Sequence, residues 1–133
     1  MDIKPKIDII VPCYNVERAI NRTLKSLIAQ NYPKDQYHCY FVNDASTDTT
    51  TSILNSYLDH SEITIINHEG NKGRAVTRNV GIKQSSSEFI CFLLQFDSVS
   101  GLIFVYSQCV PLTSSYYQEI IRSECQTNSL ASI

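Results

Sequence analysis

Short apolar runs alternate with helical periodicity as far as about Leu94, and this alternation limits the chain to few folds. Runs rich in β-branched and aromatic residues predict strands at 7–11, 37–42, 63–66 and 89–94. Apolar residues at helical spacing predict helices from Val16 to Ile28, around 53–58 and over 73–84. Strands and helices that alternate in this way form a parallel sheet with helices on both faces. The sequence therefore predicts an open, mainly parallel α/β sheet.

The pattern weakens beyond Gln95, where the chain changes in character. After Leu94 the only basic residue is Arg122. A strand at 102–106 and a short helix opening at Ser115 are compatible with the sequence of this part. We therefore divide the chain into an α/β domain, residues 1–97, and a divergent segment, residues 98–133, with the sheet incomplete at its C-terminal end.

Composition excludes several classes of protein. Lys and Arg total 11 against 13 for Asp and Glu, a balance that gives no support for nucleic-acid binding. The five cysteines are odd in number and include no C-x-x-C pair, which favours buried free thiols over a disulfide or zinc framework. No apolar stretch approaches the roughly 20 residues of a transmembrane segment, and the N-terminus lacks a signal peptide. The expected location is cytoplasmic.

Polar residues gather in three loops that follow predicted strands, at 12–15, 43–48 and 68–78. In an open parallel sheet, ligands bind at the carboxyl ends of the strands. Tyr14 offers an aromatic face to a base, and Asp44 offers an acceptor to a base N–H. Cations that suit phosphates follow in the third loop and helix: Lys72, Arg74 and Arg78. An aromatic ring, a carboxylate and several cations on one edge suit a nucleoside diphosphate.

Each of these residues also has a purely structural interpretation, which the spacing leaves open. Asp44 and Asp48 are placed to cap the second helix, and Asn15 to cap the first. Tyr14 is equally an ordinary loop aromatic, and the three cations are equally solvated surface charges. The chain contains no G-x-G-x-x-G, Walker A or G-x-S-x-G pattern, and its histidines lack metal-ligand spacing.

Three blocks within these loops together resemble family-2 glycosyltransferases. Residues 9–15 resemble the family's first strand and loop, 41–48 its V-(N/D)-D-(G/A)-S-x-D block, and 71–82 its N-x-G-x-x-x-A-R-N-x-G block. They occur in the family's order, and the resemblance covers about residues 6–93. It implies a GT-A, Rossmann-like fold and inverting transfer of a sugar from a nucleotide diphosphate sugar, with a UDP-sugar as the expected donor.

The resemblance also implies roles at the matching positions. Tyr14 and Asp44 would bind the base and nucleoside, Glu17 lies close to the first loop, and Arg78 would approach the diphosphate. The nucleotide-binding residues that it implies are Pro12, Tyr14, Asn15, Glu17, Asp44, Asn71, Gly73 and Arg78. The acceptor is unknown, and no catalytic residue is assigned.

The chain departs from the family after the fourth predicted strand. There the family carries a D-x-D-type motif that binds Mg²⁺ or Mn²⁺. In this chain Leu94 and Phe96 stand at the first two carboxylate positions of that motif, and Asp97 alone remains as a metal ligand. Leucine and phenylalanine offer no oxygen to these hard cations, which argues against the expected Mg²⁺ or Mn²⁺ cofactor here. No family-like segment follows Asp97 to supply the general base that transfer needs.

Three hypotheses therefore stand. In the first, the chain is a sugar transferase whose missing parts come from a divergent solution or from another chain. In the second, it is a truncated or degenerate relative, a pseudoenzyme, that still binds a nucleotide. In the third, it is an unrelated α/β protein, such as a flavodoxin-like one. The three blocks argue against the last. The altered metal motif favours the second for the isolated chain.

Overall fold

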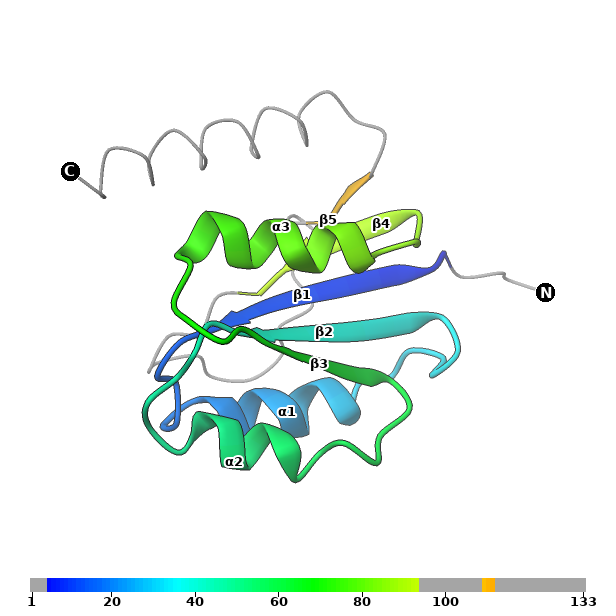
Figure 1. Ribbon diagram of the computed structural model, residues 1–133. Helices are drawn as coiled ribbons and strands as arrows, with labels where there is room; N and C mark the ends of the chain where they lie inside the picture. Colours follow the sequence, from blue (N-terminus) through cyan, green and yellow to red (C-terminus); the bar gives the residue numbers. More distant parts are fainter. Residues whose placement is uncertain (1–4, 94–108, 112–133) are drawn as a thin grey trace.

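A five-stranded sheet organises the part of the chain that the computed structural model describes, residues 5–93 and 109–111 (Figure 1). The strands lie in the order β3-β2-β1-β4-β5. Along the chain the elements are β1 (Ile7–Cys13), α1 (Ile20–Ile28), β2 (Tyr37–Asn43), α2 (Thr50–Asn55), β3 (Ile63–Asn67), α3 (Arg74–Gln84), β4 (Phe89–Phe92) and β5 (Cys109–Pro111).

The predicted parallel sheet is confirmed. β1 pairs in parallel with β2 on one side and with β4 on the other, and β2 pairs in parallel with β3. β1 is buried on both faces, as the central strand of a parallel sheet must be, and this explains its nearly continuous apolar run. β5 pairs antiparallel with β4 and was not predicted. The strand expected at 102–106 and the helix expected from Ser115 lie outside the described residues.

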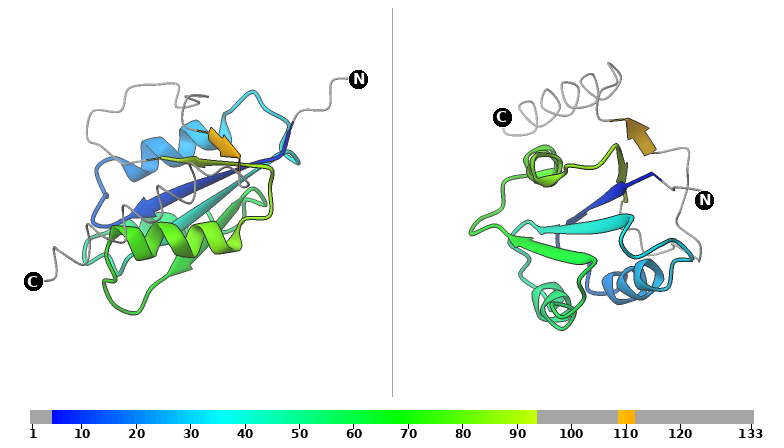
Figure 2. Two further views of the ribbon diagram at one scale, coloured as in Figure 1. Left: turned by 90° about the horizontal axis from the view of Figure 1, so that it is seen from above. Right: turned by 90° about the vertical axis from the view of Figure 1, so that its right-hand side faces the viewer.

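Helices cover both faces of the sheet, α1 and α2 on one and α3 on the other (Figure 2). The larger core lies under α1 and α2, where Leu24 and Leu54 pack with Phe41 of β2. The smaller core joins Ile10 of β1 to Ile90 and to residues of α3 and β4.

Close contact between α3 and β1 depends on a residue without a side chain. A Cβ atom added at Gly81 would lie 2.4 Å from Cγ2 of Ile10, a residue that is fully buried. Gly81 therefore allows α3 to approach the central strand, and this fixes the N-terminal turn of α3 over the carboxyl edge of the sheet.

The first helix begins later than predicted. α1 starts at Ile20 rather than Val16, and Asn15 does not cap it. Asn15 adopts a left-handed conformation, with φ of 50°, and its Oδ1 accepts hydrogen bonds from the backbone N–H groups of Thr47 and Asp48 at 2.8 and 3.3 Å. The prediction that Asn15 caps α1 was wrong because its side chain instead binds backbone N–H groups in the loop after β2, which is distant in sequence.

The cysteines follow the sequence expectation only in part. Cys13 and Cys39 are buried free thiols, and burial raises the pKa of both. Cys91 is disulfide-bonded, so the expectation of a free thiol was wrong there. In the β4–β5 register its Cα partner is Cys109, on the strand that was not predicted. Among the described residues, the helices are all too short or too polar to cross a membrane.

Candidate nucleotide-binding site

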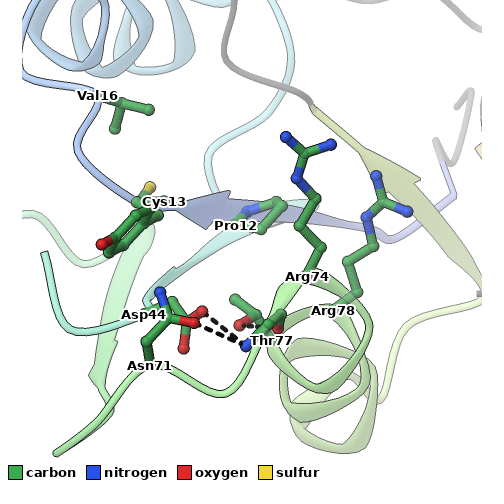
Figure 3. Close-up of a pocket in the computed structure, with 10 residues that line it drawn as sticks. Pro12, Cys13, Val16, Asp44, Asn71, Arg74, Thr77 and Arg78 are labelled. Carbon is green, nitrogen blue, oxygen red and sulfur yellow. Dashed lines mark hydrogen bonds between the residues drawn. The ribbon is translucent and has the colours of Figure 1, made fainter. Parts of the chain in front are cut away.

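A cavity of about 320 Å³ opens at the carboxyl edge of the sheet, beside the first turns of α3 (Figure 3). It is built from the end of β1 and the loop after it, the residue after β2, the loop before α3, and α3 itself. The lining residues are Pro12, Cys13, Tyr14, Val16, Asp44, Asn71, Gly73, Arg74, Thr77 and Arg78. Six of the eight residues named from the sequence therefore line one cavity.

Asp44 joins the loop that follows β2 to the loop that precedes α3. Its Oδ1 accepts hydrogen bonds from the Lys72 N–H at 2.8 Å and from Nδ1 of His68 at 3.0 Å. Its Oδ2 accepts one from the Gly73 N–H at 3.0 Å. The cap interpretation is wrong for Asp44, since none of these donors belongs to α2. A carboxylate has about four acceptor positions, so Oδ2 retains one that is not used by these three donors.

These hydrogen bonds also control the charge of Asp44. Burial acts to raise the pKa of the carboxyl, but the hydrogen bonds from His68, Lys72 and Gly73 outweigh burial and hold the pKa below its ordinary value. Asp44 is therefore an ionised acceptor at neutral pH, although its side chain is only 6% exposed.

Tyr14 lines the same cavity as Asp44. Its side chain is 48% exposed, which leaves an aromatic surface accessible at the mouth. The expectation that Tyr14 and Asp44 meet at one edge is confirmed. It follows from topology, because the two residues follow adjacent parallel strands.

Asn15 and Glu17 do not line the cavity but fasten the loop after β1 to the loop after β2. Oε2 of Glu17 accepts hydrogen bonds from the N–H and hydroxyl of Thr49 at 3.0 and 2.7 Å, and these bonds lower the pKa of Glu17. Asp48 accepts from the N–H groups of Thr50 and Glu17 at 2.9 and 3.3 Å; the N-cap residue of α2 is Thr49, so Asp48 binds the first N–H of α2 from one residue before the predicted cap position. The contribution of Asn15 and Glu17 to nucleotide binding stays a prediction.

One face of α3 supplies cations to the cavity. Arg74, Thr77 and Arg78 lie at helical positions i, i+3 and i+4, so their side chains share a face. Arg74 and Arg78 extend to the same side of α3 (Figure 3). The guanidinium carbon of Arg78 lies 6.0 Å from the centroid of the Phe92 ring. Burial, and then the charge of Arg74, lower the pKa of Arg78.

Sequence reasoning missed some lining residues. Cys13, Val16 and Thr77 received no role, and Arg74 was left out of the nucleotide-binding residues. Helical spacing from Arg78 was the available signal for Arg74 and Thr77. The Thr77 hydroxyl donates to the Gly73 carbonyl at 2.7 Å, and so holds the first turn of α3.

The described residues do not fit a divalent cation. Within residues 5–93, no three side chains of His, Cys, Asp or Glu cluster closely enough to hold a metal ion. Among the described residues that line the cavity, Asp44 is the one carboxylate, and three protein donors already engage it. Leu94, Phe96 and Asp97 lie outside the described residues.

The sheet order and the cavity at the carboxyl edge define the class, an α/β domain of the GT-A type with a cavity beside its first two strands. The chain belongs to glycosyl transferase family 2, whose family model matches residues 8–93.

Relatives with known names are similar over the same part. Poly(ribitol-phosphate) beta-N-acetylglucosaminyltransferase TarS of Staphylococcus aureus is 35% identical over 96 residues, which cover 71% of this chain and 17% of TarS. Poly(ribitol-phosphate) beta-glucosyltransferase of Bacillus spizizenii is 39% identical over 98 residues, covering 72% of this chain and 16% of the relative. The chain thus spans about a sixth of the length of these relatives.

Solved structures of two glycosyltransferases superpose on this chain. The crystal structure of S. aureus TarS 1-349 in complex with UDP-GlcNAc superposes with a TM-score of 0.64 at 36% identity, covering 69% of this chain and 26% of that one. The mannosyltransferase PcManGT of Pyrobaculum calidifontis, in complex with GDP-Man and Mn²⁺, superposes with a TM-score of 0.68 at 23% identity, covering 80% of this chain and 31% of that one. The second likeness is one of fold.

Proposed function

We propose that this chain binds a nucleotide diphosphate sugar, namely a UDP-sugar, and forms the donor-binding part of an inverting glycosyltransferase. The observation that carries the proposal is one cavity lined by an exposed aromatic ring, a buried ionised carboxylate and two arginines. The crystal structure of TarS with UDP-GlcNAc supports the choice of UDP. The nucleotide site lies within the proposed domain of residues 1–97.

The chemistry of the cavity assigns each group a part of the ligand. Tyr14 stacks on the base, and the remaining acceptor position of Asp44 takes an N–H of the base. Because Asp44 is ionised it can only accept, so it can pair with the N3–H of uracil, whereas cytosine has no hydrogen on N3 and could reach Asp44 only through its N4 amino group, at a different position on the ring. Arg78 meets the diphosphate.

The other implied residues act on the shape of the site. Pro12, Asn71 and Gly73 form its wall, and the Gly73 N–H holds Asp44 in place. Asn15 and Glu17 act indirectly, by fastening the loop that carries Tyr14 to the loop that follows Asp44. The free thiols of Cys13 and Cys39 support a cytoplasmic location, and the disulfide at Cys91 weighs against it.

A second candidate function is nucleotide binding without transfer. It is favoured by Leu94 and Phe96, which stand where the family's metal motif has carboxylates. We therefore expect the chain by itself to bind the donor and to transfer sugar at close to the background rate.

Calorimetry tests whether the chain binds the nucleotide, and a donor-consumption assay tests whether it transfers sugar. We expect UDP to bind more tightly than CDP, since a site positioned to pair with the N3–H of uracil finds no hydrogen at that position in cytosine. Failure to bind any of UDP, GDP or TDP would refute the proposed function. Consumption of UDP-, GDP- and TDP-sugars is then followed with Mn²⁺. Robust metal-dependent transfer would show that the chain is an active enzyme and refute the second candidate.

A further inference from the structure

The described residues that line the cavity carry more positive than negative charge. Two guanidinium groups, from Arg74 and Arg78, face it, whereas Asp44 is its one carboxylate among the described lining residues. Asp44 directs its oxygens at the Lys72 and Gly73 N–H groups, and both arginines extend away from it (Figure 3). Among the described lining residues the cavity therefore has two cations and one carboxylate, whose single remaining acceptor position is too few for a divalent ion.

We propose that Arg74 and Arg78 form a two-arginine clamp that holds the diphosphate of the nucleotide and replaces the divalent cation. This inference rests on the proposed function, because it concerns the same ligand in the same cavity. Two guanidinium groups carry the same charge as one divalent ion. Each also presents a planar fork of N–H donors that matches phosphate oxygens in a bidentate manner.

The two arginines are held in different ways, which suits a clamp with one fixed and one adaptable side. Arg78 is half-buried and lies against the ring of Phe92 at the end of β4. Arg74 is the first residue of α3 and is exposed. Within the described part of the chain, Arg74 forms no ion pair with a carboxylate.

Repulsion between the arginines prepares the site for an anion. The charge of Arg74 contributes, after burial, to lowering the pKa of Arg78, so the two groups lie within electrostatic reach of each other. An anion bound between them offsets this repulsion and gains from both charges. The geometry therefore stabilises a bound diphosphate more than either arginine would alone.

The test compares UDP with uridine, with and without Mn²⁺, in the full chain. We expect the UDP dissociation constant to agree within about twofold in EDTA and in Mn²⁺. Arg74→Gln removes one charged hydrogen-bonding group. We expect it to weaken UDP binding about ten- to a hundredfold and to leave uridine binding unchanged. Uridine binding is followed by ligand-observed NMR, which detects weak association.

Lys72→Gln is the matched control. It removes an exposed cation two residues before Arg74 that does not line the cavity, and whose contact with Asp44 is made by the backbone. Its UDP affinity should stay within about threefold of the wild type. Thermal unfolding of both variants checks that they are folded.

The outcomes separate the clamp from the proposed function. If UDP binds only with Mn²⁺, or if Arg74→Gln binds UDP as well as Lys72→Gln does, the clamp is refuted. Uridine binding in those cases still supports the nucleotide site. If the wild-type chain binds neither uridine nor UDP, the proposed function itself is wrong, and the clamp with it.

Discussion

Replacing Asp44 by alanine tests the link between the fold and the site. The substitution removes three hydrogen bonds from a side chain that is only 6% exposed, and leaves the donors of His68, Lys72 and Gly73 without this acceptor. A hydrogen bond to a charged group contributes about 1.5–3 kcal/mol. Water can reach the two backbone N–H groups in this partly exposed loop, so we expect the free energy of unfolding to fall by about 2–4 kcal/mol rather than by the full sum.

The same substitution is expected to weaken UDP binding beyond its effect on stability. Loss of the acceptor for the base N–H should cost about 1.5–3 kcal/mol, roughly ten- to 150-fold in the dissociation constant. Urea unfolding without ligand measures the stability. Calorimetry at a temperature where both proteins are fully folded measures the binding.

Asp48→Ala provides the control, because Asp48 lies in the same loop but outside the cavity. Loss of its bonds to the Thr50 and Glu17 N–H groups should cost about 1 kcal/mol in stability and change the UDP affinity by less than about threefold, because Glu17 keeps its bonds to Thr49. A destabilised Asp44→Ala protein that binds UDP as the wild type does would show that Asp44 is structural only. Unchanged stability would refute the assigned hydrogen bonds.

Two further predictions concern packing and pH. Gly81→Ala should lower the free energy of unfolding by about 1–2 kcal/mol, because its Cβ would overlap buried Ile10. Gly70→Ala is the control and should change the free energy of unfolding little, because a Cβ there would have no atom within 4 Å. Equal urea midpoints for the two variants would contradict the predicted overlap at Gly81. The pKa of Asp44 is lower in the folded than in the unfolded chain, so its stabilisation is present at neutral pH and is lost as the pH falls through that lowered pKa. Urea unfolding from about pH 5 to 2 should show a shallower loss in Asp44→Ala than in the wild type, and parallel curves would count against the assignment.

The sequence by itself determined the architecture and the edge at which the site lies. The period of apolar residues is a local property, and it distinguishes buried strands from amphipathic helices. Parallel strand direction then brings the residues after β1 and β2, including Tyr14 and Asp44, to the same edge. The block that contains Gly81 also has a physical basis, since α3 can approach Ile10 only where a side chain is missing.

Only the tertiary structure decided what the polar side chains do at that edge. Asn15 and Asp44 both stood where local pattern indicated helix caps, and both instead accept hydrogen bonds from loops about thirty residues away. The disulfide-bonded state of Cys91 was likewise not evident from the spacing of the cysteines. A helix-capping hydrogen bond contributes about 1 kcal/mol, so a hydrogen bond to a group that folding brings within reach can replace it. Local sequence therefore identified the polar residues, and long-range contact decided their partners.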